Sequence, residues 1–248
     1  MPLRNHSTEL IVALDFPRPD PALHLVEQLQ GLPVIYKVGL ELFLSGGPEM
    51  VRELVYRKNR VFLDLKFHDI PNTVTHAVMQ AALLHVDFLT VHLAGGSGVF
   101  RAIAEGLSEI PLLRPKILGV SVLTSFDDVR WAEVSKAISG HASEVSSSVE
   151  GLVEHSASWI DGVVCSAMEL AMIRKRYPSL FTVVPGIRPE GISAHDQSRV
   201  VTPAQAKAMG ADAIVVGRPI TQSPDPRSVA ERILADLSSG QTLQEKSS

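Results

Sequence analysis

The chain has little of what marks secreted, membrane-spanning or nucleic-acid-binding proteins. It contains one cysteine, Cys165, in 248 residues, which excludes an intrachain disulfide and favours a reducing cytoplasm. No apolar run is as long as a membrane span, and residues 1–9 lack the apolar segment of a signal peptide. The net charge is −4 and basic runs are short. We therefore expect neither a membrane nor a nucleic-acid partner, although local arginines could hold a small anion.

Common cofactor and metal motifs are also missing. The fingerprint GxGxxG does not follow the first apolar run, where the chain reads ALDFPRPDP. The run GGSG at 95–98 has the wrong spacing, and we interpret it as a turn. The nine histidines show no HxxxH or HxH spacing, so a zinc site is not expected. A Mg²⁺ site at Asp64 stays open, but the lysine beside it disfavours a cation.

Short apolar runs dominate what is present. Most are continuous rather than alternating, as expected for strands that are covered on both faces. Segments with helical spacing separate them, including 21–32, 47–58, 73–85, 98–109, 148–159, 167–177, 202–210 and 227–239. The predicted strands span 9–15, 33–39, 60–66, 87–93, 116–123, 162–167, 180–187 and 212–217.

Eight strand-then-helix units in about 240 residues predict an α/β fold, a single-domain (β/α)₈ TIM barrel. The alternative is an open doubly wound sheet, which would more often have five to seven strands. We expect the barrel to span residues 9–237, after a short tail at 1–8. The polar residues 238–248 are expected to fray.

The run VFLDLKFHDIPNT at 61–73 places Asp64, Lys66 and Asp69 at the end of an apolar strand. Charges there are costly to desolvate, so they are usually paired or functional. Asp64 and Lys66 are two residues apart and should share one face of the strand. We therefore interpret this cluster as a site rather than a solvated turn.

Other polar residues stand at the carboxyl ends of the predicted strands, where barrels carry their chemistry. A lysine inside an apolar strand, such as Lys37, is rarely a surface group. A flanking carboxylate favours the cationic form of each lysine. Asp15 could instead cap a helix, and we interpret His92 as a core group rather than a catalytic acid. The strand ends carry Asp15, Lys37, Asp64 with Lys66, His92, Thr124 with Ser125, Ser166, Arg188, and Gly217 with Arg218.

The loops after the seventh and eighth strands predict a phosphate site, which is where these barrels usually bind phosphate. Gly217 would let the backbone approach the phosphate, while Arg218 and Arg188 would supply cations. The alternative is that residues 217–219 form only a turn with an exposed arginine. The Gly- and Pro-containing segment 188–200 resembles a lid.

These motifs together resemble those of the orotidine 5′-phosphate decarboxylase family in its compact bacterial form, over residues 9–235. Asp64-x-Lys66-x-x-Asp69 alone also resembles a motif of sugar-phosphate decarboxylases and synthases. The IPNTV extension, the PGIR loop with a downstream glutamine and the GRPI run select the nucleotide enzyme. The matching motifs are ALD at 13–15, KVG at 37–39, FLDLKFHDIPNTV at 62–74, VLTS at 122–125, PGIR at 185–188 and VVGRPI at 215–220.

The resemblance implies a catalytic array of Lys37, Asp64, Lys66 and Asp69. Asp69 would come from the other subunit of a homodimer, and Thr73 would reach the ligand across the same interface. The remaining implied contacts are Asp15 and Lys37 on ribose, Thr124 or Ser125 on the pyrimidine, Gln197 between base and phosphate, and Arg188 and Arg218 on the phosphate.

The implied reaction converts orotidylate to uridylate and CO₂ without a cofactor or metal, in pyrimidine nucleotide synthesis. Lys66 would donate the proton to the C6 carbanion, since no motif offers an electron sink. Two alternatives stay open. One is a metal-dependent sugar-phosphate decarboxylase or aldolase on the same scaffold. The other is a non-catalytic nucleotide-binding barrel.

Overall fold

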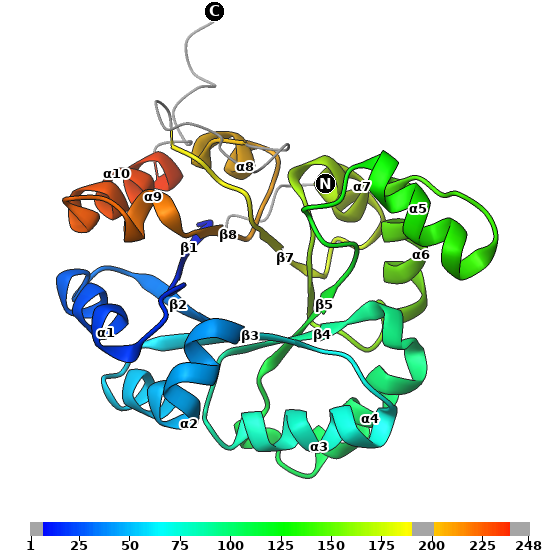
Figure 1. Ribbon diagram of the computed structural model, residues 1–248, viewed down its shortest axis with the longest axis horizontal. Coiled ribbons are helices and arrows are strands. Elements are labelled where there is room, and N and C mark those ends of the chain that lie inside the picture. Colours follow the sequence, from blue (N-terminus) through cyan, green and yellow to red (C-terminus); the bar gives the residue numbers. More distant parts are fainter. Residues whose placement is uncertain (1–6, 190–200, 239–248) are drawn as a thin grey trace, which may run out of the picture.

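Eight parallel strands form a closed barrel in the order β1 to β8. The computed structural model describes residues 7–189 and 201–238, and Figure 1 shows the helices arranged around the strands. The predicted (β/α)₈ fold and all eight predicted strands are confirmed. The strands are β1 Glu9–Ala13, β2 Val34–Gly39, β3 Arg60–Phe67, β4 Phe88–His92, β5 Lys116–Val120, β6 Gly162–Val164, β7 Phe181–Val184 and β8 Ala213–Val216.

The helices follow the predicted segments with three differences, one of which is the short helix α9 (Arg218–Thr221), which no predicted segment covers. Helix α5 was not predicted. Trp131 packs against the core, but Ser135 is the only fully buried residue of the helix and Val129 and Ile138 are exposed, so its apolar face is weak. Helix α2 begins before the predicted start at 47 and is kinked at Gly47, whose φ is 61°. The helices are α1 Pro19–Gln28, α2 Leu40–Tyr56, α3 Pro71–Ala82, α4 Ser97–Ser108, α5 Asp128–Ser139, α6 Val145–Ser156, α7 Ala167–Arg176, α8 Pro203–Ala208, α9 Arg218–Thr221 and α10 Pro226–Ser238, with short 3₁₀ turns at Leu93–Gly95 and Pro111–Leu113.

Several strands end earlier than the sequence predicts. β5 ends at Val120 rather than at residue 123, and β7 ends at Val184 rather than at residue 187. Val122 and Ile187, which follow these ends, are still buried. Apolar character therefore continues into the loops at the barrel mouth, so it does not mark where strand pairing stops.

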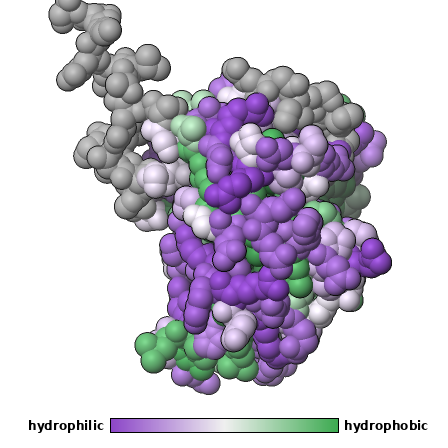
Figure 2. All heavy atoms as spheres, turned by 90° about the vertical axis from the view of Figure 1, so that its left-hand side faces the viewer, coloured by the Kyte–Doolittle hydropathy of each residue, from purple (hydrophilic) through white to green (hydrophobic). Residues whose placement is uncertain are grey.

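Two apolar layers hold the barrel together. The larger layer lies between the strands and the surrounding helices. The outer faces of the helices on the left of Figure 1 are mainly hydrophilic, as Figure 2 shows. The smaller layer is a separate cluster of strand residues, and we place it inside the barrel, which is packed rather than open. Its members are Ile11, Ile35, Phe62, Phe88, Leu118, Val183 and Ala213.

Three aspartates join neighbouring strands by hydrogen bonds at the amino ends of the strands. Each aspartate directly precedes an even-numbered strand and accepts the backbone N–H at the start of the preceding strand. Each also pairs with an arginine, which reduces the cost of its partial burial. This end of the barrel is therefore fixed independently of the mouth. The bonds join Asp87 to Val61 (2.8 Å), Asp161 to Ile117 (2.8 Å) and Asp212 to Thr182 (2.7 Å).

Among the described residues, no helix is both long and apolar enough to cross a bilayer. The predicted tails at 1–8 and 238–248 lie largely outside the described residues, and so does most of the predicted lid at 188–200.

Candidate active site

Four charged side chains alternate in sign at the barrel mouth. Lys37 and Asp64 each stand two residues beyond a member of the interior cluster, so strand alternation directs both into the barrel. The Lys37 Nζ lies 3.0 Å from Asp15 Oδ1 and 3.7 Å from Asp64 Oδ2. The Lys66 Nζ lies 2.8 Å from Asp64 Oδ1. The structure thus brings together Asp15, Lys37, Asp64 and Lys66, which we call the charged array.

The charged array runs from solvent into the protein. The Asp15 side chain is 61% exposed, whereas those of Lys37 and Asp64 are almost fully enclosed. Enclosing an ion pair costs desolvation energy that its attraction only partly repays. The charged array therefore contributes little to folding stability, but it holds an ammonium group in a fixed position.

Gly39 leaves room for one contact of the array. A Cβ at this position would lie 3.0 Å from the Lys37 Nζ and 3.5 Å from Asp15 Oδ1. Such a contact is tighter than ordinary van der Waals packing. Glycine at the end of β2 therefore lets the Lys37 ammonium reach Asp15.

The backbone at Lys66 departs from a regular strand. Its φ is +51°, in the left-handed region that non-glycine residues rarely adopt. The pairing of β3 with β4 is interrupted here, because the register passes from Leu63–Leu89 to Phe67–Val91. Strain of this kind, of order 1–3 kcal/mol, persists where the surroundings hold it in place.

Thr90 on β4 holds this strained segment, and our sequence reasoning missed it. Its buried hydroxyl accepts the Lys66 N–H at 2.9 Å and donates to Asp64 Oδ1 at 3.0 Å. A signal was available, since Thr90 stands two residues beyond Phe88 and so shares the inward face of an apolar strand.

Asp69 and Thr73 lie apart from the charged array. Both are exposed, and Asp69 Oδ1 accepts the N–H of Ile70 at 2.6 Å. Within residues 7–189 and 201–238, no ion pair joins Asp69 to a cation. A single chain therefore does not place Asp69 against Lys66.

The predicted phosphate residues stand after β7 and β8. Arg188 is buried, and its Nη1 donates to the Ile187 carbonyl at 2.9 Å. Arg218 begins α9 and is half-buried. A Cβ at Gly217 would lie 3.7 Å from Asp15 Oδ2, so the end of β8 is close to the charged array.

The predicted base contacts are less well defined. Thr124 is half-buried in the turn after β5, whereas Ser125 is exposed. This difference favours Thr124 as the residue that faces the barrel mouth. Gln197 lies outside the described residues. In the part of the chain that is described, no group of three or more His, Cys, Asp and Glu side chains is arranged for a metal ion.

His92 lies beside the charged array at the end of β4. Its ring centroid is 5.3 Å from that of His68. Burial lowers the pKa of His92 below its ordinary value of 6.5, and electrostatic interaction with the neighbouring His68 and Lys66 lowers it further. His92 is therefore neutral at neutral pH.

The depressed pKa of His92 predicts a pH-dependent stability. Below about pH 6.5 the unfolded chain takes up a proton at His92 more readily than the folded chain. The free energy of unfolding of the wild type should therefore fall, relative to that of His92→Asn, as the pH falls from 7 to 5. Urea titrations at fixed protein concentration measure this difference, and a difference that stayed constant with pH would contradict it.

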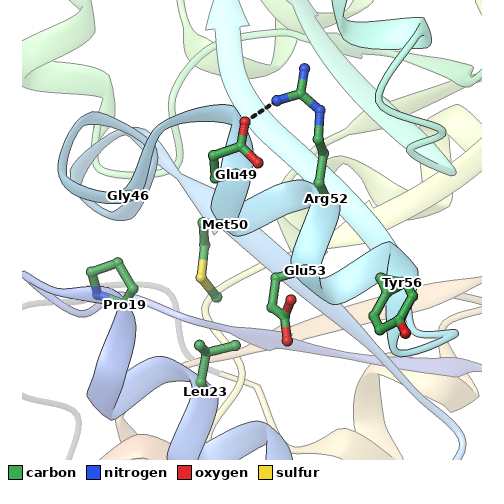
Figure 3. Close-up of a pocket in the computed structure, with 8 residues that line it drawn as sticks. All are labelled: Pro19, Leu23, Gly46, Glu49, Met50, Arg52, Glu53 and Tyr56. Atoms are coloured by element: carbon green, nitrogen blue, oxygen red, sulfur yellow. Dashed lines mark hydrogen bonds and ion pairs between the residues drawn. The ribbon is translucent and has the colours of Figure 1, made fainter.

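A hollow of about 560 Å³ lies away from this site, between α1 and α2 (Figure 3). None of the predicted site residues lines it. Its carboxylates pair with arginines, Glu49 with Arg52 and Glu53 with Arg57. The hollow therefore belongs to the outer layer of helices and not to the charged array. The lining residues are Pro19, Leu23, Gly46, Glu49, Met50, Arg52, Glu53 and Tyr56.

Known proteins resemble this chain over nearly its whole length. A protein of Nitratidesulfovibrio vulgaris (strain DP4), named orotidine 5′-phosphate decarboxylase, is 44% identical over 239 residues, which cover 92% of this chain and 97% of that protein. A protein of the same name from Legionella pneumophila (strain Corby) is 45% identical over 230 residues, covering 92% and 99%. The crystal structure of orotidine 5′-phosphate decarboxylase from Lactobacillus acidophilus superposes with a TM-score of 0.80 at 34% identity, covering 93% and 99%.

The family model described as orotidine 5′-phosphate decarboxylase / HUMPS matches residues 8–233, which is nearly the whole barrel. The match extends over every strand that contributes to the charged array. On this match and these relatives, the chain belongs to the orotidine 5′-phosphate decarboxylase / HUMPS family.

Proposed function

We propose that this chain decarboxylates orotidine 5′-phosphate to uridylate and CO₂ in pyrimidine nucleotide synthesis. The observation that carries the proposal is the charged array. It stands in a chain that aligns over almost the full length of a relative named orotidine 5′-phosphate decarboxylase. Both oxygens of Asp64 face ammonium groups, at 2.8 and 3.7 Å. This arrangement favours the nucleotide reaction over a sugar-phosphate reaction that needs a divalent cation at Asp64.

Lys66 is the residue to which we assign the chemical step. When CO₂ leaves, the electron pair of the broken bond stays on C6, in the plane of the pyrimidine ring. An ammonium group beside C6 stabilises this charge and then donates its proton to C6. Lys66 is left as a neutral amine and regains a proton from solvent before the next turnover. No cofactor is needed, because no group other than the ammonium has to accept the charge.

Asp64 and Lys37 orient the reacting group. Asp64 Oδ1 fixes the Lys66 Nζ, and Asp64 Oδ2 faces Lys37. Lys37, held also by Asp15, is near enough to the exposed rim to meet ribose hydroxyls together with Asp15. Thr124 would face the pyrimidine, and Gln197 would link the base to the phosphate. Alternating charges fix each side chain from both sides, which preorganises the site.

The phosphate provides binding energy far from C6. Arg188, Arg218 and the backbone at Gly217 stand after β7 and β8, where barrels of this kind bind phosphate. Energy released there can assist the chemical step as well as affinity, if it closes the site around the substrate.

The site also requires a second copy of the chain. Asp69 and Thr73 are exposed, and we assign them to the neighbouring subunit's site. Apolar side chains near the same mouth support a homodimer interface, since Ile70 is 65% exposed and Leu44 is 82% exposed. Because Ile70 directly follows Asp69, burying it against a partner would carry Asp69 to that partner.

We assign the enzyme to the cytoplasm. Its single thiol, Cys165, is free and fully buried, and burial raises its pKa, so it serves as an inert core residue. An unpaired thiol and a nucleotide substrate suit a reducing compartment.

The test is an assay of orotidine 5′-phosphate with EDTA-treated protein. Loss of orotidylate absorbance, with uridylate as product, is expected at the rate of the untreated protein. Absence of turnover would reject the proposal. A requirement for Mg²⁺ with consumption of a keto-sugar phosphate would favour the second class of enzyme. Tight uridylate binding without turnover would favour a non-catalytic nucleotide-binding barrel.

A further inference from the structure

Thr90 is a fully buried polar side chain that contacts two members of the charged array at once. It lies on β4 between Phe88, a member of the interior cluster, and His92. Its relative exposure is 0%. A hydroxyl so deep in an apolar barrel costs free energy unless both its donor and its acceptor functions are satisfied.

The two hydrogen bonds of Thr90 go to the backbone of Lys66 and to the carboxylate that holds the ammonium group of the same lysine. The hydroxyl accepts the backbone N–H of Lys66 at 2.9 Å. It also donates to Asp64 Oδ1 at 3.0 Å, the oxygen that binds the Lys66 Nζ at 2.8 Å. One hydroxyl therefore holds the backbone of Lys66 directly, and it holds the ammonium group of Lys66 indirectly, through Asp64.

The backbone at Lys66 needs such support. Its φ of +51° falls where the ladder between β3 and β4 is interrupted. A left-handed residue outside the ladder has lost the strand bonds that would otherwise hold it, and the Thr90 hydroxyl supplies an acceptor in their place.

We propose that Thr90 is a positioning residue for decarboxylation, whose hydroxyl holds Lys66 and Asp64 in the geometry that places the ammonium group at C6. This inference rests on the proposed function. In this proposal Thr90 does not contact the reacting atoms of the substrate, and it acts only through Lys66 and Asp64. It should therefore affect the chemical step much more than the binding of the nucleotide.

The experiment compares Thr90→Val, which keeps the shape of the side chain, with Thr90→Ser, which keeps the hydroxyl. For Thr90→Val, we expect kcat to fall by about tenfold to a hundredfold, while KM and the Kd of uridylate change by less than about threefold. For Thr90→Ser, we expect kcat within about threefold of the wild type, because the hydroxyl can still bridge the two partners.

Thr182 provides a matched control at the opposite end of the barrel. It is also a fully buried strand threonine whose hydroxyl bonds an aspartate carboxylate and a backbone N–H, both of Asp212. Thr182→Val and Thr90→Val should both lower the melting temperature, because each removes the hydrogen bonds of a buried hydroxyl, but Thr182→Val should leave kcat unchanged. This contrast separates a loss of positioning from a general loss of stability.

Three results would overturn the inference: Thr90→Val with kcat within threefold of the wild type, Thr90→Ser as impaired as Thr90→Val, or Thr182→Val with the same loss of kcat. If Thr90→Val does not fold, Thr90→Ala and Thr90→Ser carry the comparison. Their kcat ratio should then be about tenfold or more in favour of serine, and a ratio near one rejects the inference. Wild-type turnover, measured alongside, tests the proposed function separately.

Discussion

Replacing Lys66 by alanine should lower kcat for orotidine 5′-phosphate by roughly 10⁴-fold or more, equivalent to about 5.4 kcal/mol of activation free energy. The loss is large because one ammonium group is assigned both the stabilisation of the C6 carbanion and the donation of its proton. The Kd of uridylate, by contrast, should change by less than about tenfold, since the phosphate and ribose contacts lie elsewhere.

The Lys66→Ala chain should fold normally. Asp64 would still face Lys37 and still accept the Thr90 hydroxyl at 3.0 Å, so no buried carboxylate is left without a partner. The left-handed backbone would tolerate alanine no worse than lysine, because both carry a Cβ. The effect on turnover can therefore be read as chemistry rather than as unfolding.

Lys116→Ala is the matched control. Lys116 begins β5, at the opposite end of the barrel, and its Nζ lies over the Phe88 and Phe181 rings. Its loss removes these two cation–π contacts but nothing near the mouth. Single-turnover measurements of both variants should show a loss only for Lys66→Ala. Turnover within tenfold of the wild type would refute the assigned proton donor.

Most of the barrel could be predicted from the sequence, because its strands are short apolar runs covered on both faces. Helix α5 could not, since only Trp131 packs against the core while Val129 and Ile138 are exposed, so its apolar pattern is weak. The ends of β5 and β7 could not be predicted either, because buried apolar residues continue into the loops at the mouth. Contacts between strands decide where strand pairing ends, and the local sequence pattern does not show these contacts.

The charged array could be predicted only in part, because some of its contacts leave a local sequence pattern and others depend on two strands. Lys37 stands out as a charge in an apolar strand, and its spacing from Ile35 directs it inward. Thr90 faces inward in the same way but does not stand out, because threonine is a common strand residue. The role proposed for Thr90 depends on the interrupted pairing of β3 and β4 at Lys66, which is a property of two strands together. The assignment of Asp69 to the site of another subunit came from the resemblance alone.

The assignment of Asp69 to a neighbouring subunit predicts complementation between two inactive chains. Lys66→Ala and Asp69→Ala should each lower activity by about a hundredfold or more when tested alone. In a mixed dimer, one site loses both residues, whereas the other site has an intact Lys66 from one chain and an intact Asp69 from its partner. Random pairing makes about half of the dimers mixed, so about a quarter of the wild-type activity should return.

The control mixes Lys66→Ala with Lys37→Ala. Both residues belong to the charged array of a single chain, where Asp64 stands between them. Every site of a mixed dimer then lacks one of the two lysines, and no activity should return. Co-expression of differently tagged chains, with isolation of the mixed dimer, makes the measurement direct. If Asp69 served its own chain's site, the Lys66→Ala and Asp69→Ala pair would also stay inactive, so recovery in that pair alone identifies a site shared between subunits.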